Sequence, residues 1–273
     1  MAVLSLPGQS RSIVWICLIL QVFAFNAVAH HSQRNLLACV IAFFVGGYIT
    51  DTISGLFHFS FDYVWPARFP VMGPVAVEFR GHHLKPGLDP SALVANITRG
   101  AYGAIPFAIT AWHITTTAEE TWGNFLRVAI YMSTSIWMLG FHQIHSYTHM
   151  GSKLPADEFN KAVLKISQLP TRRQQKEGFV KLFRELGIPR YVRVLQRCRV
   201  FLRPEVHWRH HINFETDFSS VNGWSDPLMN LIYRPIARWR KVKGLPDSHR
   251  TAHELDRAAN SAVSEGSTAA GPA

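Results

Sequence analysis

The chain has 273 residues, of which 48% are hydrophobic and 17% charged, and its 28 Lys and Arg against 18 Asp and Glu give a formal charge of +10. This apolar content excludes an intrinsically disordered chain. Three cysteines without paired spacing exclude a disulfide scaffold or a zinc ribbon. The basic charge suggests nucleic acid or an anionic membrane surface as a partner. No zinc-finger, helix-turn-helix or RNA-recognition pattern is present, so we expect no nucleic acid partner.

Long apolar runs occupy the first half of the chain. Three runs with at most one charge are each about long enough to cross the roughly 30 Å core of a bilayer as a helix: residues 13–29, 36–57 and 125–147. Residues 101–114 contain Pro106 and either span when extended to Thr117 or form a re-entrant segment. We therefore predict an all-α integral membrane protein with about four transmembrane helices. A large soluble helical core is the alternative.

The chain divides into three predicted parts. Residues 1–35 form an N-terminal span and loop, residues 36–243 form the main domain, and residues 244–273, rich in Ala, Ser and Gly, form a disordered tail. The first part also resembles a signal peptide, because Arg11 precedes the apolar run and Ala27-Val28-Ala29 follows it.

Charge sets the expected orientation. Residues 1–150 carry a net charge of +1, whereas residues 151–273 carry +9. Four spans put the second half on one side of the membrane, and the loops on the opposite side hold Arg34 and Glu119-Glu120. By the positive-inside rule, we expect the second half to form a cytoplasmic, histidine-rich helical cap. We expect the membrane to be a bacterial inner membrane or the endoplasmic reticulum.

Eight of the fourteen histidines converge on this cytoplasmic face: His58, His82, His83, His145, His149, His207, His210 and His211. His145 and His149, like His207 and His211, are four residues apart, so each pair shares a helix face. Imidazole suits Zn, Cu, Fe and Ni, but eight imidazoles exceed the four ligands of one zinc ion. Without an HExxH or CxxCH motif, a dinuclear non-haem iron centre that uses O2 fits best.

A polar stripe runs along the second apolar run: Asp51, Ser54, Gly55, His58 and Asp62. Polar groups are costly in lipid, so this stripe is expected to face the bundle interior or a site. Asp62 either orients a ligand such as His58 or acts as a helix-end charge or a partner for Arg80. Three weaker candidates for supporting the ligands are Glu78, His142 and Gln143.

Five motifs occur in the same order as similar motifs of a known family. They are Asp51-x-x-Ser54-Gly55-x-x-His58-x-x-x-Asp62, Glu78-Phe79-Arg80-Gly81-His82-His83, Gln143-Ile144-His145-x-x-x-His149, His207-x-x-His210-His211 and Asn222-Gly223-Trp224. They resemble the membrane lipid desaturases of the Kua/CarF type, which include plasmanylethanolamine desaturase and a plastid phosphatidylglycerol desaturase. The resemblance implies two Fe2+ ions held by the same eight histidines, O2 as co-substrate, a membrane phospholipid substrate and an electron donor such as cytochrome b5 or ferredoxin.

The resemblance implies a desaturase that introduces a double bond into the 1-O-alkyl chain of an ether phospholipid, to give a vinyl ether. Three features depart from the plasmalogen-forming members: a basic insertion at 152–186, His142 in place of Asn, and Gly81, which is closer to the plastid branch. An acyl-lipid desaturase or a hydroxylase with the same site is the first alternative. A metal-stabilised membrane adaptor or regulatory protein is the non-enzymatic alternative.

Overall fold

The computed structural model describes residues 9–32, 34–70, 72–84, 88–149 and 156–243, and all regular secondary structure in this part is α-helical, as predicted. The helices are α1 (Gln9–His30), α2 (Leu36–Tyr63), α3 (Met72–Leu84), α4 (Leu93–Thr117), α5 (Trp122–His149), α6 (Ala156–Ser167), α7 (Arg172–Glu185), α8 (Arg190–Arg197), α9 (Pro204–Asn213) and α10 (Asp226–Val242). The predicted tail at 244–273 lies outside the described residues.

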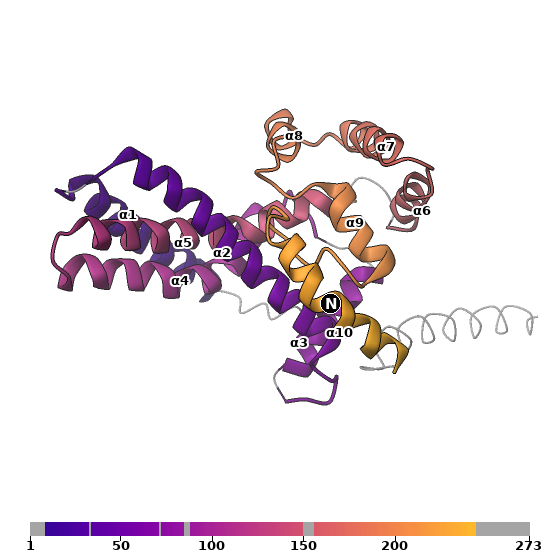
Figure 1. Cartoon of the computed structure of the whole chain (residues 1–273), viewed down its shortest axis with the longest axis horizontal. Coiled ribbons are helices and arrows are strands. Elements are labelled where there is room, and N and C mark those ends of the chain that lie inside the picture. The colour runs from indigo at the N-terminus through magenta and orange to yellow at the C-terminus, as the bar shows by residue number, and fades with distance from the viewer. Residues whose placement is uncertain (1–8, 33, 71, 85–87, 150–155, 244–273) are drawn as a thin grey trace, which may run out of the picture.

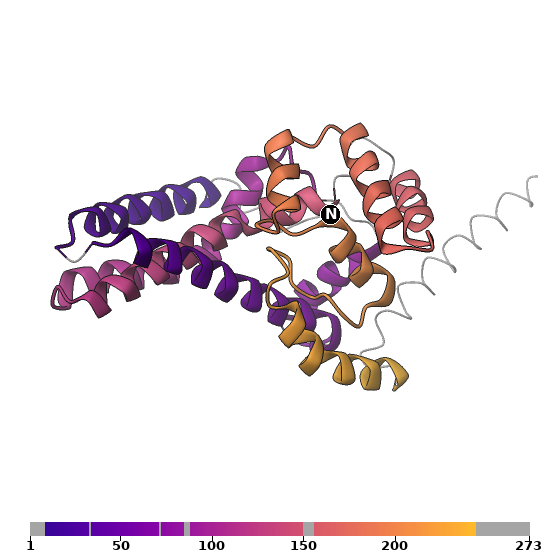
Figure 2. The same ribbon diagram turned by 45° about the horizontal axis from the view of Figure 1, so that its top comes forward.

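Four long helices form an elongated bundle. The helices α1, α2, α4 and α5 run side by side, and α3 and α6–α10 gather at one end of them as a globular part (Figure 1 and Figure 2). By length and composition, residues 12–30 of α1 and the whole of α2 are able to cross a membrane. The helix α4 continues through Pro106 to Thr117 without a break.

Small residues allow the bundle helices to approach closely. A Cβ atom added at Gly100 of α4 would lie 2.3 Å from the carbonyl oxygen of Leu139 in α5, and one at Gly46 of α2 would lie 2.5 Å from Oγ of Ser133. The indole of Trp137 donates a hydrogen bond across the same α2–α5 contact, to a main-chain carbonyl of α2 at 3.0 Å. Such approach is typical of helix pairs that associate without a hydrophobic driving force between them.

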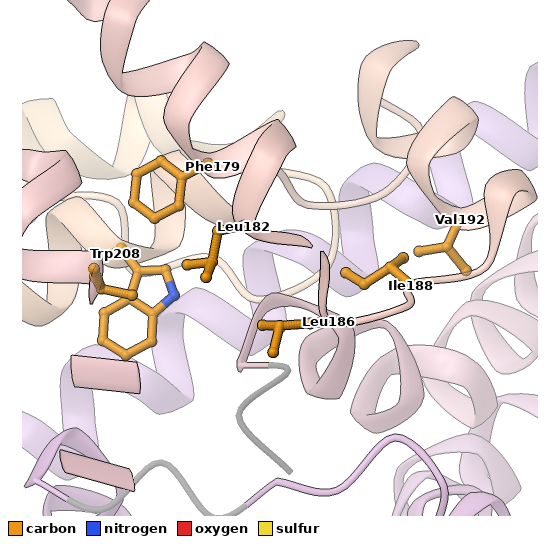
Figure 3. Packing of buried hydrophobic residues seen from close by; sticks show 7 residues of the cluster. Phe179, Leu182, Leu186, Ile188, Val192 and Trp208 are labelled. Atoms are coloured by element: carbon orange, nitrogen blue, oxygen red, sulfur yellow. The ribbon is translucent and has the colours of Figure 1, made fainter. Parts of the chain in front are cut away.

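The globular part has its own apolar core. Phe179 and Leu182 of α7 pack against Trp208 of α9, and the core extends to Ile188, just before α8, and to Val192 in α8 (Figure 3). Trp208 also donates a hydrogen bond from Nε1 to the carbonyl of a residue in α5, at 3.0 Å. Both α6 and α7 contact α9. Because these two helices lie within the predicted basic insertion at 152–186, the described residues of that segment support α9.

The substitution Gly100→Ala is expected to destabilise the bundle. The new methyl group would overlap main-chain atoms of α5, and overpacking of this kind costs about 1–3 kcal/mol. Gly103→Ala on the same helix is the matched control, because its Cβ would meet only the flexible Met138 side chain, at 3.4 Å. The control is expected to be neutral or stabilising, by up to about 1 kcal/mol from helix propensity. Thermal unfolding of both variants in detergent measures the difference, and equal midpoints would contradict it.

Candidate metal centre

Four helices bring all eight predicted histidines to the junction between the bundle and the globular part. His58 comes from α2, His82 and His83 from α3, His145 and His149 from α5, and the other three from α9. Seven of the eight side chains are buried, and His82 is half-buried. Imidazoles from segments up to 153 positions apart in the sequence are therefore packed against one another.

One cluster consists of His82, His149, His207 and His211, whose ligand atoms all lie within 4.8 Å of one another. The Nε2 atom of His207 is 2.8 Å from that of His149 and 3.0 Å from that of His211. His145 adjoins this cluster, with its Nε2 atom 2.9 Å from that of His207 and 3.0 Å from that of His149. Five imidazoles thus converge on one point.

A second cluster consists of His58, Asp62, His83 and His210, again with all ligand atoms within 4.8 Å of one another. The Asp62 carboxylate lies 3.6 Å from Nε2 of His58, 3.5 Å from Nε2 of His83 and 3.3 Å from Nε2 of His210. The two clusters are adjacent, because the rings of His82 and His83, one from each, have centroids 4.4 Å apart.

The donor atoms in these clusters fit metal ions better than they fit one another. A neutral imidazole has a single N–H, so three Nε2 atoms about 3 Å apart cannot satisfy one another by hydrogen bonds. Two ligands bonded at about 2.1 Å to one ion are about 3 Å apart when they subtend a right angle. Within the described part of the chain, both Asp62 oxygens and the Nε2 atoms of His82 and His210 are buried without a hydrogen bond. Such groups are costly unless a partner is supplied.

Several of the same imidazoles also form a hydrogen bond through their other ring nitrogen, Nδ1. Nδ1 of His58 is 3.2 Å from the Ser220 hydroxyl, and Nδ1 of His210 is 2.9 Å from the Thr216 carbonyl. Nδ1 of His82 bonds to the carbonyl of Phe79. Metal-bound histidines are commonly oriented in this way, with Nε2 left for the ion.

Electrostatics favours the neutral, metal-binding form of these side chains. Burial lowers the pKa of His82 to about 4. Burial, followed by the neighbouring histidines, lowers the pKa values of His83, His207 and His211 well below their ordinary range. At neutral pH these imidazoles therefore keep their lone pairs available for a cation.

The other candidates from the sequence occupy different places. Glu78 is exposed on α3, and His142 is half-buried on α5. Gln143 bonds to the Asn96 side chain at 2.9 Å and to the carbonyl of a residue before α4 at 3.0 Å, so it braces α4 against α5. Arg80 donates to two main-chain carbonyls near the end of α2. The ion-pair contacts of Asp62 are with the histidines of the second cluster.

Asp51 is the supporting residue whose partner the sequence did not reveal. Its carboxylate is buried in the middle of α2 and accepts hydrogen bonds from the main chain of residues 221–223 and 225, at 2.9–3.3 Å, and from the Ser225 hydroxyl at 2.8 Å. Ser54, one turn later, accepts from the main-chain N–H of Ser220 at 3.1 Å. Since Ser220 contacts His58, α2 fixes the loop that orients one of its own histidines. The polar stripe was the signal in the sequence.

Comparison with known proteins supports a similarity to lipid desaturases. The model described as the lipid desaturase domain matches residues 48–181. Plasmanylethanolamine desaturase 1 of Mus musculus is 24% identical over 267 residues, which cover 90% of this chain and 80% of the relative. No solved structure matches the chain significantly. The predicted resemblance to membrane lipid desaturases is confirmed, although the family match ends before α9, which carries three of the clustered histidines.

The Asp226 carboxyl group, next to the Asp51 network, has an unusual pKa. One of its oxygens accepts from the Ser219 main chain at 3.0 Å, and the other is buried without a partner among the described residues. Burial first, and then the charges of Asp51 and Asp217, raise the pKa of Asp226 from 3.8 to about 8. The folded protein therefore holds this proton more tightly than the unfolded chain does.

A pH-dependent stability difference between wild type and Asp226→Asn is expected. The stabilisation from the bound proton is present below pH 4 and is lost as the pH rises to about 8. The variant should therefore gain stability relative to wild type over this window, by up to about 1.4 kcal/mol per pH unit. Unfolding curves at several pH values measure this difference, in which other groups cancel. Exposed Glu119→Gln is the control, and parallel curves for Asp226→Asn and wild type would refute the assignment.

Proposed function

We propose that the chain is a di-iron, O2-dependent oxidoreductase that introduces a double bond into a membrane lipid chain, because the lipid desaturase domain model matches residues 48–181. The observation that carries the proposal is the pair of adjacent buried clusters, which offer eight imidazoles and one carboxylate. In the reaction, a CH2–CH2 unit, O2, two electrons and two protons give a CH=CH unit and two molecules of water.

The proposed ligands divide between two ions. His82, His149, His207 and His211, with His145 beside them, hold one ion, and His58, His83, His210 and Asp62 hold the other. Iron bound at both positions supplies the capacity to reduce O2 and to remove hydrogen from an unactivated chain. The protein's own part is to present neutral imidazoles in fixed orientations and to exclude water from the junction. The serine and carbonyl groups behind the rings hold these orientations.

The proposed substrate is the 1-O-alkyl chain of an ether phospholipid, which would become a vinyl ether. The name of the mouse relative supports this choice, since that protein is a plasmanylethanolamine desaturase. An acyl chain is the other candidate, because the same chemistry applies to any pair of adjacent methylene groups.

The proposed arrangement is multi-pass, with α1, α2, α4 and α5 across the membrane and the clusters on the cytoplasmic side. Large apolar side chains on all four helices face outward; Trp15, Leu37, Trp112 and Ile136 each expose 46–67% of their surface. The connections α1–α2 and α4–α5 lie at the same end, where the Ser32 main chain donates to Glu120 at 3.3 Å. The clusters lie at the opposite end, from which a lipid headgroup region is within reach.

An external carrier must deliver the two electrons, and we propose a cytochrome b5 or ferredoxin type of protein. Such carriers are acidic, and the second half of the chain carries a net charge of +9. Complementary charge would raise the rate of encounter between the two proteins.

Loss of product without loss of protein is expected for His145→Ala. This substitution removes the imidazole that adjoins the first cluster, whereas His113→Ala alters an exposed histidine of α4 and serves as the control. Lipidomics of cells that express each form measures vinyl ether lipids and new acyl double bonds. Vinyl ethers that disappear only with His145→Ala support the ether substrate, and acyl double bonds that do so support the acyl alternative. Unchanged lipids would refute the proposal.

Metal content gives a second test. The wild-type protein is expected to bind about two iron atoms per chain, and Asp62→Ala about one, because Asp62 belongs only to the second cluster. Glu78→Gln, on the exposed side of α3, is expected to keep both ions. Elemental analysis of purified, membrane-extracted protein measures the ratio. Wild-type protein without iron, or Asp62→Ala with undiminished iron, would contradict the ligand assignment.

A further inference from the structure

A cleft of about 900 Å³ lies in the globular part, between α7, α8 and the start of α9. It is separate from the histidine clusters, since none of their residues lines it. Its volume falls in the range of pockets that hold small molecules. The apolar core of Figure 3 joins the helices that form its walls, so the cleft is part of a packed structure.

The lining of the cleft is strongly basic. Eight Lys and Arg side chains line it against two glutamates, Glu177 and Glu205. The glutamates pair with Arg173 at 3.0 Å and Arg203 at 3.4 Å. The other six basic residues have no acidic partner within the described part of the chain. A concave surface with this excess of positive charge concentrates anions.

The helical spacing places the arginines of α8 on the same side of the cleft. Arg190, Arg193 and Arg197 are at i, i+3 and i+7 of α8 and therefore lie on one face of that helix. They line the cleft together with four basic residues of α7: Arg173, Lys176, Lys181 and Arg184. The N-terminus of α9, at Pro204, also opens on the cleft and adds the positive end of its helix dipole.

Two unsatisfied donors point to a ligand. The Gln196 side chain lines the cleft and is only 6% exposed, yet its Nε2 atom has no hydrogen-bond partner among the described residues. Nε of Arg193 is likewise buried without a partner there. A buried donor without an acceptor costs free energy, which an acceptor placed in the cleft would recover.

We propose that this cleft binds a phosphate-bearing ligand. A phosphate group offers several acceptor oxygens and matches the planar guanidinium fork. An acidic protein would instead touch exposed charges over a broad surface and would leave the buried Gln196 amide unmatched. The proposal requires neither the iron centre nor the desaturase reaction.

The test uses the full-length protein in an uncharged maltoside detergent at constant ionic strength. Calorimetry measures the binding of inorganic pyrophosphate and of phosphatidic acid in mixed micelles. Binding of both probes indicates that the phosphate group suffices, and binding of phosphatidic acid alone identifies a lipid headgroup as the source. In either case, the double variant Arg193→Gln/Arg197→Gln is expected to weaken binding about tenfold or more.

The matched control is Arg234→Gln/Lys243→Gln, which removes the same charge from exposed positions outside the cleft. Equal weakening by both double variants, or no binding of either probe, would overturn the proposal. Binding of polyglutamate alone would also overturn it, in favour of an acidic protein partner.

Gln196→Met gives an independent readout. It is expected to weaken pyrophosphate binding while leaving the ligand-free protein as stable as wild type or more so, because the unpaired amide is removed. A loss of stability with unchanged binding would assign Gln196 a structural role instead and contradict the proposal. Iron content, measured on the same preparations, separates failure here from failure of the proposed function.

Discussion

The buried carboxylate of Asp51 joins the two halves of the chain. It lies in the middle of an apolar helix and accepts main-chain hydrogen bonds from a loop about 170 positions later. A charge in this environment is tolerated only when its acceptor sites are filled by donors of good geometry. The loop supplies those donors, and α2 in return fixes where α9 ends and α10 begins.

The histidine clusters depend on that attachment. The helices α2, α3 and α5 contribute five imidazoles, and only the placement of α9 adds His207, His210 and His211. The Nε2 atoms of His145, His149 and His207 lie about 3 Å from one another. The arrangement is unfavourable for neutral imidazoles alone and favourable around cations, so metal binding and the packing of α9 should stabilise each other.

The helix α9 has two different neighbours. Its histidines face the clusters, whereas Trp208 packs on α7 and its N-terminus opens on the basic cleft. The segment at 152–186 therefore does more than add positive charge, since α7 forms both the support behind α9 and one wall of the cleft. A ligand that bound there would contact the same helix that completes the histidine clusters.

The sequence alone indicated the four long helices and the shared faces of the paired histidines, because apolar runs and helical periodicity are local and the spacing of four residues fixes which side chains align. It also indicated the family, through motifs that lie in order along the chain. Only the tertiary structure decided which histidines group together, that Asp62 joins one group, that Gln143 braces α4, and that Glu78 is exposed. It alone revealed the partner of Asp51 and the cleft beside α9. These properties arise from contacts between segments tens to more than a hundred residues apart, which depend on how the helices pack and not on the spacing within any one of them.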